Sequence, residues 1–201
     1  MNSIERFLLD SGLSWTMSKL LPYILMVFIG LLLVFILKRF VAKMKLPVRL
    51  LIKLTVLILP FVLYFAVAPI YQGDFSNNSV EISKDDAYKE LTGKRLVVLT
   101  IPGCPYCFEA LGRMKKLKER VPAIEIDYIV CHTDPETMDW YKQEAGDAVN
   151  VKMAENIKSM SELAFGVFPT FVLVDGDKTL RTWSNDNFGV SAMDEIELNF
   201  N

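Results

Sequence analysis

Two cysteines separated by two residues are the part of this sequence best suited to chemistry. The motif Cys104-Pro105-Tyr106-Cys107 follows an apolar run, Arg95–Ile101, that is typical of a strand buried on both faces. A proline–glycine pair ends this run, and a helix is predicted over residues 104–120. Free N–H groups at a helix N-terminus stabilise an anion. A thiolate at Cys104 would therefore have a lowered pKa and react near neutral pH.

This placement predicts thiol–disulfide exchange. Cys107 lies one turn further along the helix, where it would be shielded and close enough to form a disulfide with Cys104. In the expected cycle Cys104 attacks a substrate disulfide, a mixed disulfide forms, and Cys107 resolves it. The same steps run backwards oxidise a dithiol. Pro105 takes an early helical position, where a missing N–H does no harm.

Three other uses of the pair are open from the residues alone. It could be half of a zinc site, but the chain has no second cysteine pair, and His132 is its only histidine. It could be a structural disulfide, although so short a loop gains little chain entropy. A copper site of Cys104, Cys107 and His132 is chemically conceivable. We expect no metal here, and we expect the third cysteine, Cys131, to be an inert buried thiol, with a redox or intermolecular role as the alternative.

The elements that must position the motif alternate between helices and strands. We predict helices at 83–92 (capped by Ser83), 104–120, 134–145, 156–165 and 192–198 (capped by Ser191), and strands at 95–101, 124–131, 149–154, 171–174 and 179–183, with a turn at Asp175-Gly176-Asp177. Strands separated by helices imply parallel pairing, and the last hairpin adds an antiparallel edge. The predicted fold class is α/β, with a central mixed sheet flanked by helices.

A later segment, Phe168-Pro169-Thr170, completes a pattern that resembles the thioredoxin-fold family over residues 80–201. The stretches TDPETMDWYKQEAG and GVFPTFVLVDGDK resemble the TlpA-like branch, whereas CPYC is the motif common in glutaredoxins. The resemblance implies a thioredoxin-like fold, a redox-active Cys104–Cys107 disulfide and a cis Phe168–Pro169 bond opposite it. The substrate-binding residues that it implies are Pro105, Tyr106, Phe168, Pro169 and Thr170.

The sequence departs from the family pattern at two places. Ile101-Pro102-Gly103 stands where a tryptophan usually precedes the motif, and Val98 falls about where thioredoxins bury an acid behind the dithiol. Glu109 is the nearest acid in sequence and is therefore a candidate proton relay. These departures leave the redox potential, and with it the direction of electron flow, open.

The first third of the chain predicts two membrane spans. The 201 residues are 52% apolar, with a mean hydropathy of +0.28, although 23% are charged. Residues 20–37 and 54–73 form uncharged runs of 18 and 20 residues. At about 1.5 Å per residue, each run matches the roughly 30 Å hydrocarbon core of a bilayer. We predict a transmembrane helix over each run, with a pair of buried core helices as the alternative.

The charges predict the topology. Residues 38–53 carry six basic side chains and no acid, so the positive-inside rule places this loop in the cytoplasm. Residues 1–19, a tether at 74–82 and the thioredoxin-like domain at 83–201 then lie on the opposite side. From residue 74 onward the chain has 14 Lys+Arg and 22 Asp+Glu, a net charge of −8, which gives no electrostatic case for binding nucleic acid. The predicted location is a bacterial inner membrane, double-pass, with the N-terminus and the domain in the periplasm.

These features favour a membrane-anchored thiol–disulfide oxidoreductase that reduces specific exported proteins. We expect no cofactor besides the Cys104–Cys107 disulfide. The predicted partners are exported protein dithiols or disulfides, membrane lipid and a separate membrane electron donor, because neither span contains a cysteine. The alternative is a non-catalytic thioredoxin-like subunit or assembly factor of a membrane protein complex.

Overall fold

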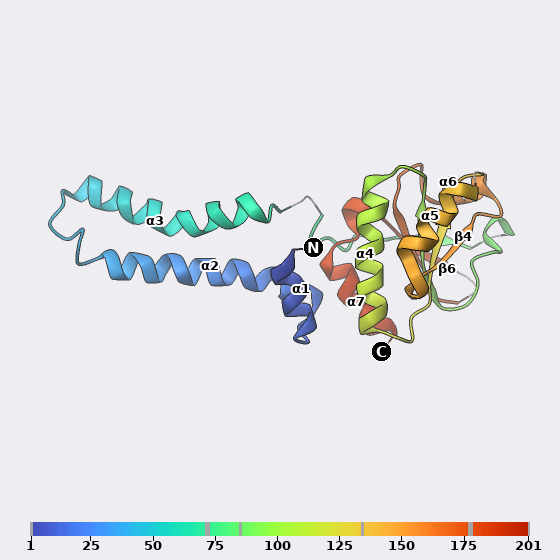
Figure 1. Cartoon of the computed structure of the whole chain (residues 1–201), viewed down its shortest axis with the longest axis horizontal. Helices are drawn as coiled ribbons and strands as arrows, with labels where there is room; N and C mark the ends of the chain where they lie inside the picture. The colour runs from blue at the N-terminus through green and yellow to red at the C-terminus, as the bar shows by residue number, and fades with distance from the viewer. Residues whose placement is uncertain (1, 71–72, 85, 134, 177–178, 201) are drawn as a thin grey trace. The chain divides into compact units, whose positions relative to one another are not determined.

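Residues Met1–Gln72 and Gly73–Asn201 form separate units in the computed structural model (Figure 1). The structure describes residues 2–70, 73–84, 86–133, 135–176 and 179–200. In the first unit a short helix, α1 (Ser3–Asp10), precedes two long ones, α2 (Trp15–Leu37) and α3 (Leu46–Val67). The side chain of Ser14 caps α2 by accepting the N–H of Met17 at 3.2 Å.

Helices α2 and α3 lie side by side and pack through small and aromatic residues (Figure 1). A Cβ added to Gly30 would lie 2.7 Å from the backbone oxygen of Leu57, so glycine permits the close approach there. The rings of Tyr23 and Tyr64 meet edge to face at 5.5 Å. Both helices are long and apolar enough to cross a membrane.

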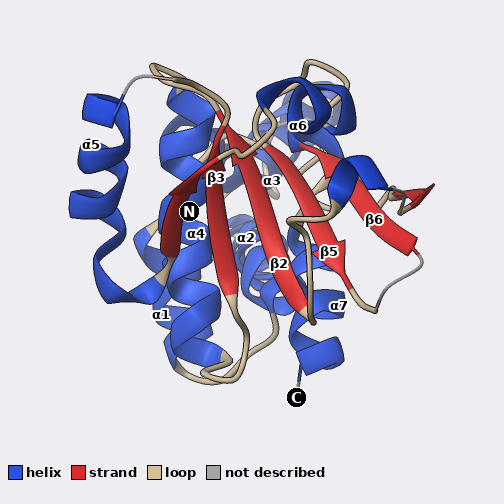
Figure 2. Cartoon of the chain, turned by 90° about the vertical axis from the view of Figure 1, so that its right-hand side faces the viewer, coloured by secondary structure: helices blue, strands red, loops and turns tan. Residues whose placement is uncertain are grey.

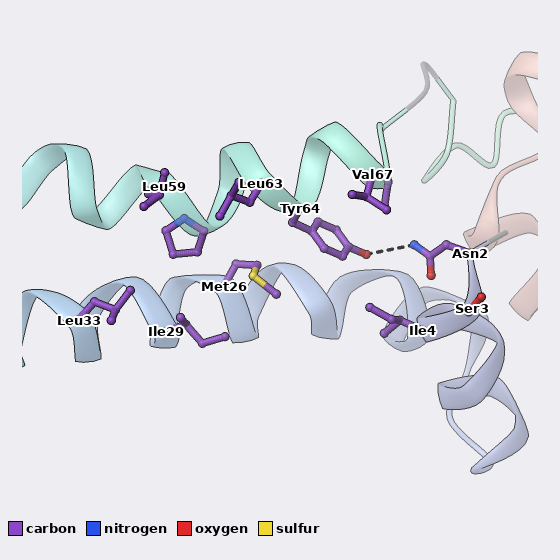
Figure 3. A pocket seen from close by; sticks show the side chains of 12 residues that line it. Asn2, Ser3, Ile4, Met26, Ile29, Leu33, Leu59, Leu63, Tyr64 and Val67 are labelled. Carbon is purple, nitrogen blue, oxygen red and sulfur yellow. Dashed lines mark hydrogen bonds between the residues drawn. The ribbon is translucent and has the colours of Figure 1, made fainter.

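An apolar cavity of about 680 Å³ lies between α2 and α3 (Figure 3). At its polar end Asn2 Nδ2 donates to the hydroxyl of Tyr64 at 3.2 Å. Helix α1 is fixed at this end by Glu5, which forms a capping box with Asn2 and an ion pair with Lys19 at 3.1 Å. The other lining residues are mostly aliphatic: Ser3, Ile4, Met26, Ile29, Leu33, Leu59, Pro60, Leu63, Val67 and Ala68.

The bounds of the long helices differ from the predicted spans. Helix α2 begins at Trp15 rather than at residue 20, and α3 begins at Leu46 and ends at Val67 rather than covering 54–73. The second half of the predicted loop, from Leu46 onward, is helical because Pro47, at the first helical turn, favours a helix start. The non-helical link between the two helices is therefore shorter than predicted. Residues 71 and 72 of the predicted second span lie outside the described residues.

The second unit is built around a six-stranded mixed sheet (Figure 2). Its strands are β1 (Val80–Ser83), β2 (Arg95–Thr100), β3 (Ile126–Val130), β4 (Asn150–Met153), β5 (Thr170–Val174) and β6 (Thr179–Ser184), in the spatial order β1-β6-β5-β2-β3-β4. Strands β2, β3 and β4 are parallel, whereas β5, β6 and β1 add to β2 as successive antiparallel pairs. Strand β2, which leads to the cysteine motif, is thus central.

Helices cover both faces of this sheet. They are α4 (Pro105–Arg120), α5 (Pro135–Ala145), α6 (Ile157–Leu163) and α7 (Val190–Phe200), with 3₁₀ turns η1 (Asp86–Tyr88), η2 (Gly146–Ala148) and η3 (Asn185–Asn187). Met160 and Leu163 of α6 pack in one core with Val97 and Leu99. On the other face α4 and α7 are joined by two hydrogen bonds from Arg120 to Glu197, at 2.8 and 3.0 Å. The domain has the predicted thioredoxin-like fold.

Residues 74–92 are the part of the domain that the sequence prediction placed wrongly. In place of the predicted helix over 83–92, capped by Ser83, strand β1 ends at Ser83 and the short turn η1 covers Asp86–Tyr88, while Asp85 lies outside the described residues. The VEIS segment pairs with the open edge of β6, and this long-range pairing outweighs a local helix signal built on two aspartates, which are poor helix formers.

The predicted tether over 74–82 is also part of the domain. Trp183 Nε1 donates to Asn77 Oδ1 at 2.9 Å, and the backbone of Ser76 accepts the N–H of Gly189 at 3.0 Å. Its last residues, from Val80 onward, belong to β1. Residues 74–82 therefore belong to the domain and do not form a free tether.

The remaining elements lie within a few residues of their predicted positions. The last helix begins at Val190 and runs to Phe200, so Ser191 lies inside its first turn rather than capping it. Asn156 caps α6, its side chain accepting the N–H of Ser159 at 3.1 Å. Asp134, in the predicted helix start, and Asp177, in the predicted turn, lie outside the described residues.

Candidate active site

Cys104 and Cys107 lie at the start of α4, just beyond the end of the central strand β2, and a disulfide joins them. Cys104 is the N-cap residue, and its Sγ accepts the backbone N–H of Cys107 at 3.2 Å. Pro105 is the first helical residue. Gly103 has φ +68°, a left-handed conformation that the strand-to-helix turn requires and that glycine adopts without strain.

The two cysteines differ in their access to solvent. Cys104 keeps 9% of its surface exposed, whereas Cys107 keeps 0%. A partner sulfur can therefore reach Cys104 but not Cys107. Because the N–H groups of the first helical turn point toward Cys104, the same residue is the one whose thiolate the helix stabilises.

The loop before β5 borders the disulfide. Its Phe168–Pro169 bond is cis, as the resemblance implied. Cys104 Sγ lies 3.8 Å from the carbonyl oxygen of Phe168. Thr170 is buried, and its hydroxyl donates to the carbonyl oxygen of Val167 at 2.7 Å. Among the residues predicted to bind substrate, Phe168 thus lies beside the disulfide, whereas the side chain of Thr170 holds the loop.

Exposed apolar side chains occur in the motif itself and in the loop that borders it. Pro105 is exposed and Tyr106 is 59% exposed. In the loop before the cis proline, Phe165 is 68% and Val167 47% exposed. Phe165 has φ +50°, an uncommon conformation for a residue with a side chain. No local sequence pattern marks Phe165 or Val167, because a single exposed apolar residue in a loop has no periodicity.

Neither Val98 nor Glu109 supplies a buried acid behind the dithiol. Val98 is buried in β2, in register with Tyr128 of β3 and Phe171 of β5. Glu109 is exposed on α4, two residues beyond Cys107. It is therefore not a buried substitute for the acid that Val98 replaces, and its role as a proton relay stays a prediction.

Two buried tyrosines that the sequence analysis did not single out hold the backbone around the motif. The Tyr128 hydroxyl donates to the carbonyl oxygen of Cys107 at 2.8 Å, and the Tyr141 hydroxyl donates to that of Ile101 at 3.0 Å. Both tyrosines are 0% exposed. The sequence offered one weak signal, a tyrosine in the middle of a strand that is buried throughout.

Arg113 is a further unpredicted feature of the same helix. Its guanidinium lies over the ring of Phe171 at 5.6 Å, and its Nη1 donates to the carbonyl oxygen of Phe188 at 3.2 Å. Phe171 and Phe188 stack at 3.9 Å. Burial lowers the pKa of Arg113 from its ordinary value, and the nearby Asp74 and Glu109 partly counter this effect. These contacts fasten α4 to the sheet.

Cys131 is buried and free, as predicted from its place at the end of a strand. Burial raises the pKa of its thiol to about 12, and the negative charge of Glu90 adds to this effect. His132 follows it at an exposed position. Within the described residues no group of three or more His, Cys, Asp and Glu side chains is arranged to hold a metal ion.

No protein-family model matches the chain, and none of the curated proteins does. Three bacterial proteins are among those whose solved structures are similar to it. A secreted Mycobacterium tuberculosis disulfide oxidoreductase homologous to E. coli DsbE is 19% identical, over 53% of this chain and 84% of that one, with a TM-score of 0.41. The thioredoxin domain of a Bacteroides vulgatus thiol-disulfide oxidoreductase is 16% identical, over 66% and 99%, with a TM-score of 0.46. A thiol:disulfide interchange protein from Bacteroides sp. is 14% identical, over 65% and 91%, with a TM-score of 0.42.

Proposed function

We propose that this protein is a membrane-anchored thiol–disulfide oxidoreductase that reduces specific exported proteins. The observation that carries the proposal is the arrangement of the Cys104–Cys107 pair. The pair lies at a helix N-terminus, only Cys104 is accessible, and the Cys104 sulfur lies 3.8 Å from the backbone of the cis-proline loop. A structural disulfide needs none of these features.

The reaction proceeds in two exchanges. The Cys104 thiolate attacks one sulfur of a substrate disulfide, forms a new S–S bond and expels the other substrate sulfur as a thiolate, which takes a proton. Cys107 then loses its proton and attacks Cys104, so that the Cys104–Cys107 disulfide forms and the second substrate thiol leaves. The substrate gains two electrons and two protons. The protein loses the two electrons, the proton of Cys107 and the proton that Cys104 released to solvent when it became a thiolate.

Helices α2 and α3 are proposed to anchor the protein in a bacterial inner membrane, with the thioredoxin-like domain in the periplasm. The basic residues between the apolar runs support this orientation through the positive-inside rule. The two helices contain no cysteine. We therefore assign the reduction of the Cys104–Cys107 disulfide to a separate membrane electron donor, and we assign no resident cofactor to this chain.

The test is a trapping experiment with the full-length chain expressed in bacterial cells. A Cys107→Ser variant in a Cys131→Ala background cannot complete the second exchange, so mixed disulfides through Cys104 should accumulate and disappear on reduction. The matched control, Cys104→Ser in the same background, should trap none.

Two results would contradict the proposal. Equal adducts in both variants would show that Cys104 is not the attacking residue. No adduct in either variant, together with full in vivo function of Cys104→Ser, would favour the non-catalytic subunit or assembly factor.

A further inference from the structure

Two buried tyrosines each donate a hydrogen bond to a backbone carbonyl of the strand-to-helix turn that carries the cysteines. Tyr128, in the middle of β3, reaches Cys107, and Tyr141, from α5, reaches Ile101. These carbonyls lie at the two ends of the turn. The positions of the two sulfurs relative to the sheet therefore depend on two phenol hydroxyls.

The tyrosines belong to one buried aromatic cluster. Their rings are 5.8 Å apart, and the ring of Tyr141 is also 5.5 Å from Phe108, the residue that follows Cys107. Tyr128 lies directly beside Val98 in the sheet, on the face that α4 covers. Val98 carries no polar group, so at this pair of positions the hydroxyl of Tyr128 is the group that bonds to the motif.

Both hydroxyls act as neutral donors. Burial raises the pKa of Tyr128 and of Tyr141 above the ordinary value for tyrosine, so neither ionises near neutral pH. The buried acids among the described residues are Glu5 and Asp127. Asp127 precedes Tyr128 in β3 and therefore faces the opposite side of the sheet, where it pairs with Arg95. No buried carboxylate in the described part of the chain thus serves the dithiol face.

We propose that Tyr128 and Tyr141 are positioning residues for the closing exchange, an inference that rests on the proposed function. In this exchange Cys107 gives its proton to solvent, its sulfur attacks Cys104 in the mixed disulfide, and the substrate thiolate leaves and is protonated. The rate depends on how well the Cys107 sulfur is held in line with the bond that it attacks. The opening exchange uses only Cys104, the one sulfur that keeps some access to solvent, so it does not depend on this alignment.

The experiment compares Tyr128→Phe and Tyr141→Phe with the wild-type chain, each full-length in detergent and each in a Cys131→Ala background. The substitutions keep the rings and remove only the hydroxyls. Rapid mixing with a disulfide probe whose leaving thiol is coloured gives the opening rate, and acid-quenched mass spectrometry gives the closing rate. The matched control is Thr182→Val on β6, which removes a hydroxyl that donates to the carbonyl oxygen of Val80 on β1 at 3.2 Å.

We expect each tyrosine variant to close about fivefold more slowly, as expected for the loss of one buried hydrogen bond, with an opening rate within twofold of the wild type. With the reverse rate unchanged, fivefold slower closing makes the disulfide fivefold less stable relative to glutathione, which raises the reduction potential by about 20 mV. Thr182→Val should change neither rate. Equal slowing of both steps, or a fall in melting temperature with both rates unchanged, would overturn the inference. If the reduced wild-type chain does not react with the disulfide probe at all, the proposed function itself is refuted.

Discussion

Removing the charge of Asp127 should destabilise the domain by an amount that depends on pH. The Asp127 side chain accepts hydrogen bonds from Arg95 at 2.9 Å, Asn150 at 3.0 Å and Lys152 at 3.0 Å. Burial alone would raise the pKa of Asp127, but these three donors outweigh it and hold the pKa below the ordinary value of 3.8. The carboxylate is therefore ionised in the folded protein throughout the neutral range.

The magnitude follows from the exposure of the partners. Removing one member of a fully buried ion pair costs about 3–5 kcal/mol. The side chain of Asp127 is only 3% exposed, but those of Arg95 and Lys152 are 22% and 33% exposed and can regain water. We therefore expect Asp127→Asn to cost about 2 kcal/mol at pH 7. For a domain of this size that is a fall of about 6–10 °C in melting temperature.

The sign of the pH dependence follows from the lowered pKa. Ionised Asp127 contributes its stability above the pKa of the unfolded chain, and this contribution is lost as the pH falls through the lower pKa of the folded state. The difference between wild type and Asp127→Asn should thus be constant from pH 7 to about pH 5 and shrink below pH 4. Thermal unfolding of the full chain in detergent, followed by near-UV circular dichroism, measures it.

The matched control is Glu125→Gln. Glu125 pairs with the same Arg95 at 2.8 Å, but its side chain is 62% exposed, so its loss should cost no more than about 0.5 kcal/mol. The reasoning is refuted if the two variants lose equal stability at pH 7, or if the effect of Asp127→Asn is the same at pH 3 as at pH 7.

Three further predictions concern other parts of the chain. Burial raises the pKa of Cys131 to about 12, so iodoacetamide at pH 8 should modify Cys104 in the reduced native protein but Cys131 only after unfolding. Peptide mass spectrometry measures the labelling of each cysteine. Labelling of both cysteines in the native protein would contradict this prediction. Gly30→Ala should destabilise the α2–α3 pair by about 1–3 kcal/mol through overpacking, which the thermal loss of helix signal measures. The control Gly112→Ala should not destabilise the chain, because a Cβ added at Gly112 would have no atom within 4 Å. A cysteine at position 43, introduced by Lys43→Cys in a chain without other cysteines, should react with an impermeant maleimide only after spheroplasts are permeabilised; labelling of intact spheroplasts would reverse the proposed topology.

The cysteine motif and the central strands could be predicted because their signals are local. The apolar run of β2, the break at Pro102-Gly103 and the N-cap position of Cys104 all lie within ten residues. Strand β1 could not be predicted, because its four residues are stabilised by pairing with β6, about one hundred residues away. The local acids of this region instead indicated a helix.

The site was predicted in part for the same reason. Cys107 and Phe168 belong to recognisable motifs, whereas Tyr141 reaches the turn only because α5 packs beside the sheet. No residue spacing encodes that packing. Thr170 was expected at the substrate surface from its motif alone, and its hydroxyl is instead used within the loop.

Equilibrium titration of the Cys104–Cys107 pair against glutathione most directly tests whether it is a redox centre that reduces its substrates. We expect the full-length chain in detergent to show one reversible two-electron transition, absent in Cys104→Ser, at a potential clearly more negative than about −120 mV. A pair that does not titrate reversibly would contradict a redox role, and a transition near about −120 mV would contradict the reducing direction and indicate an oxidase.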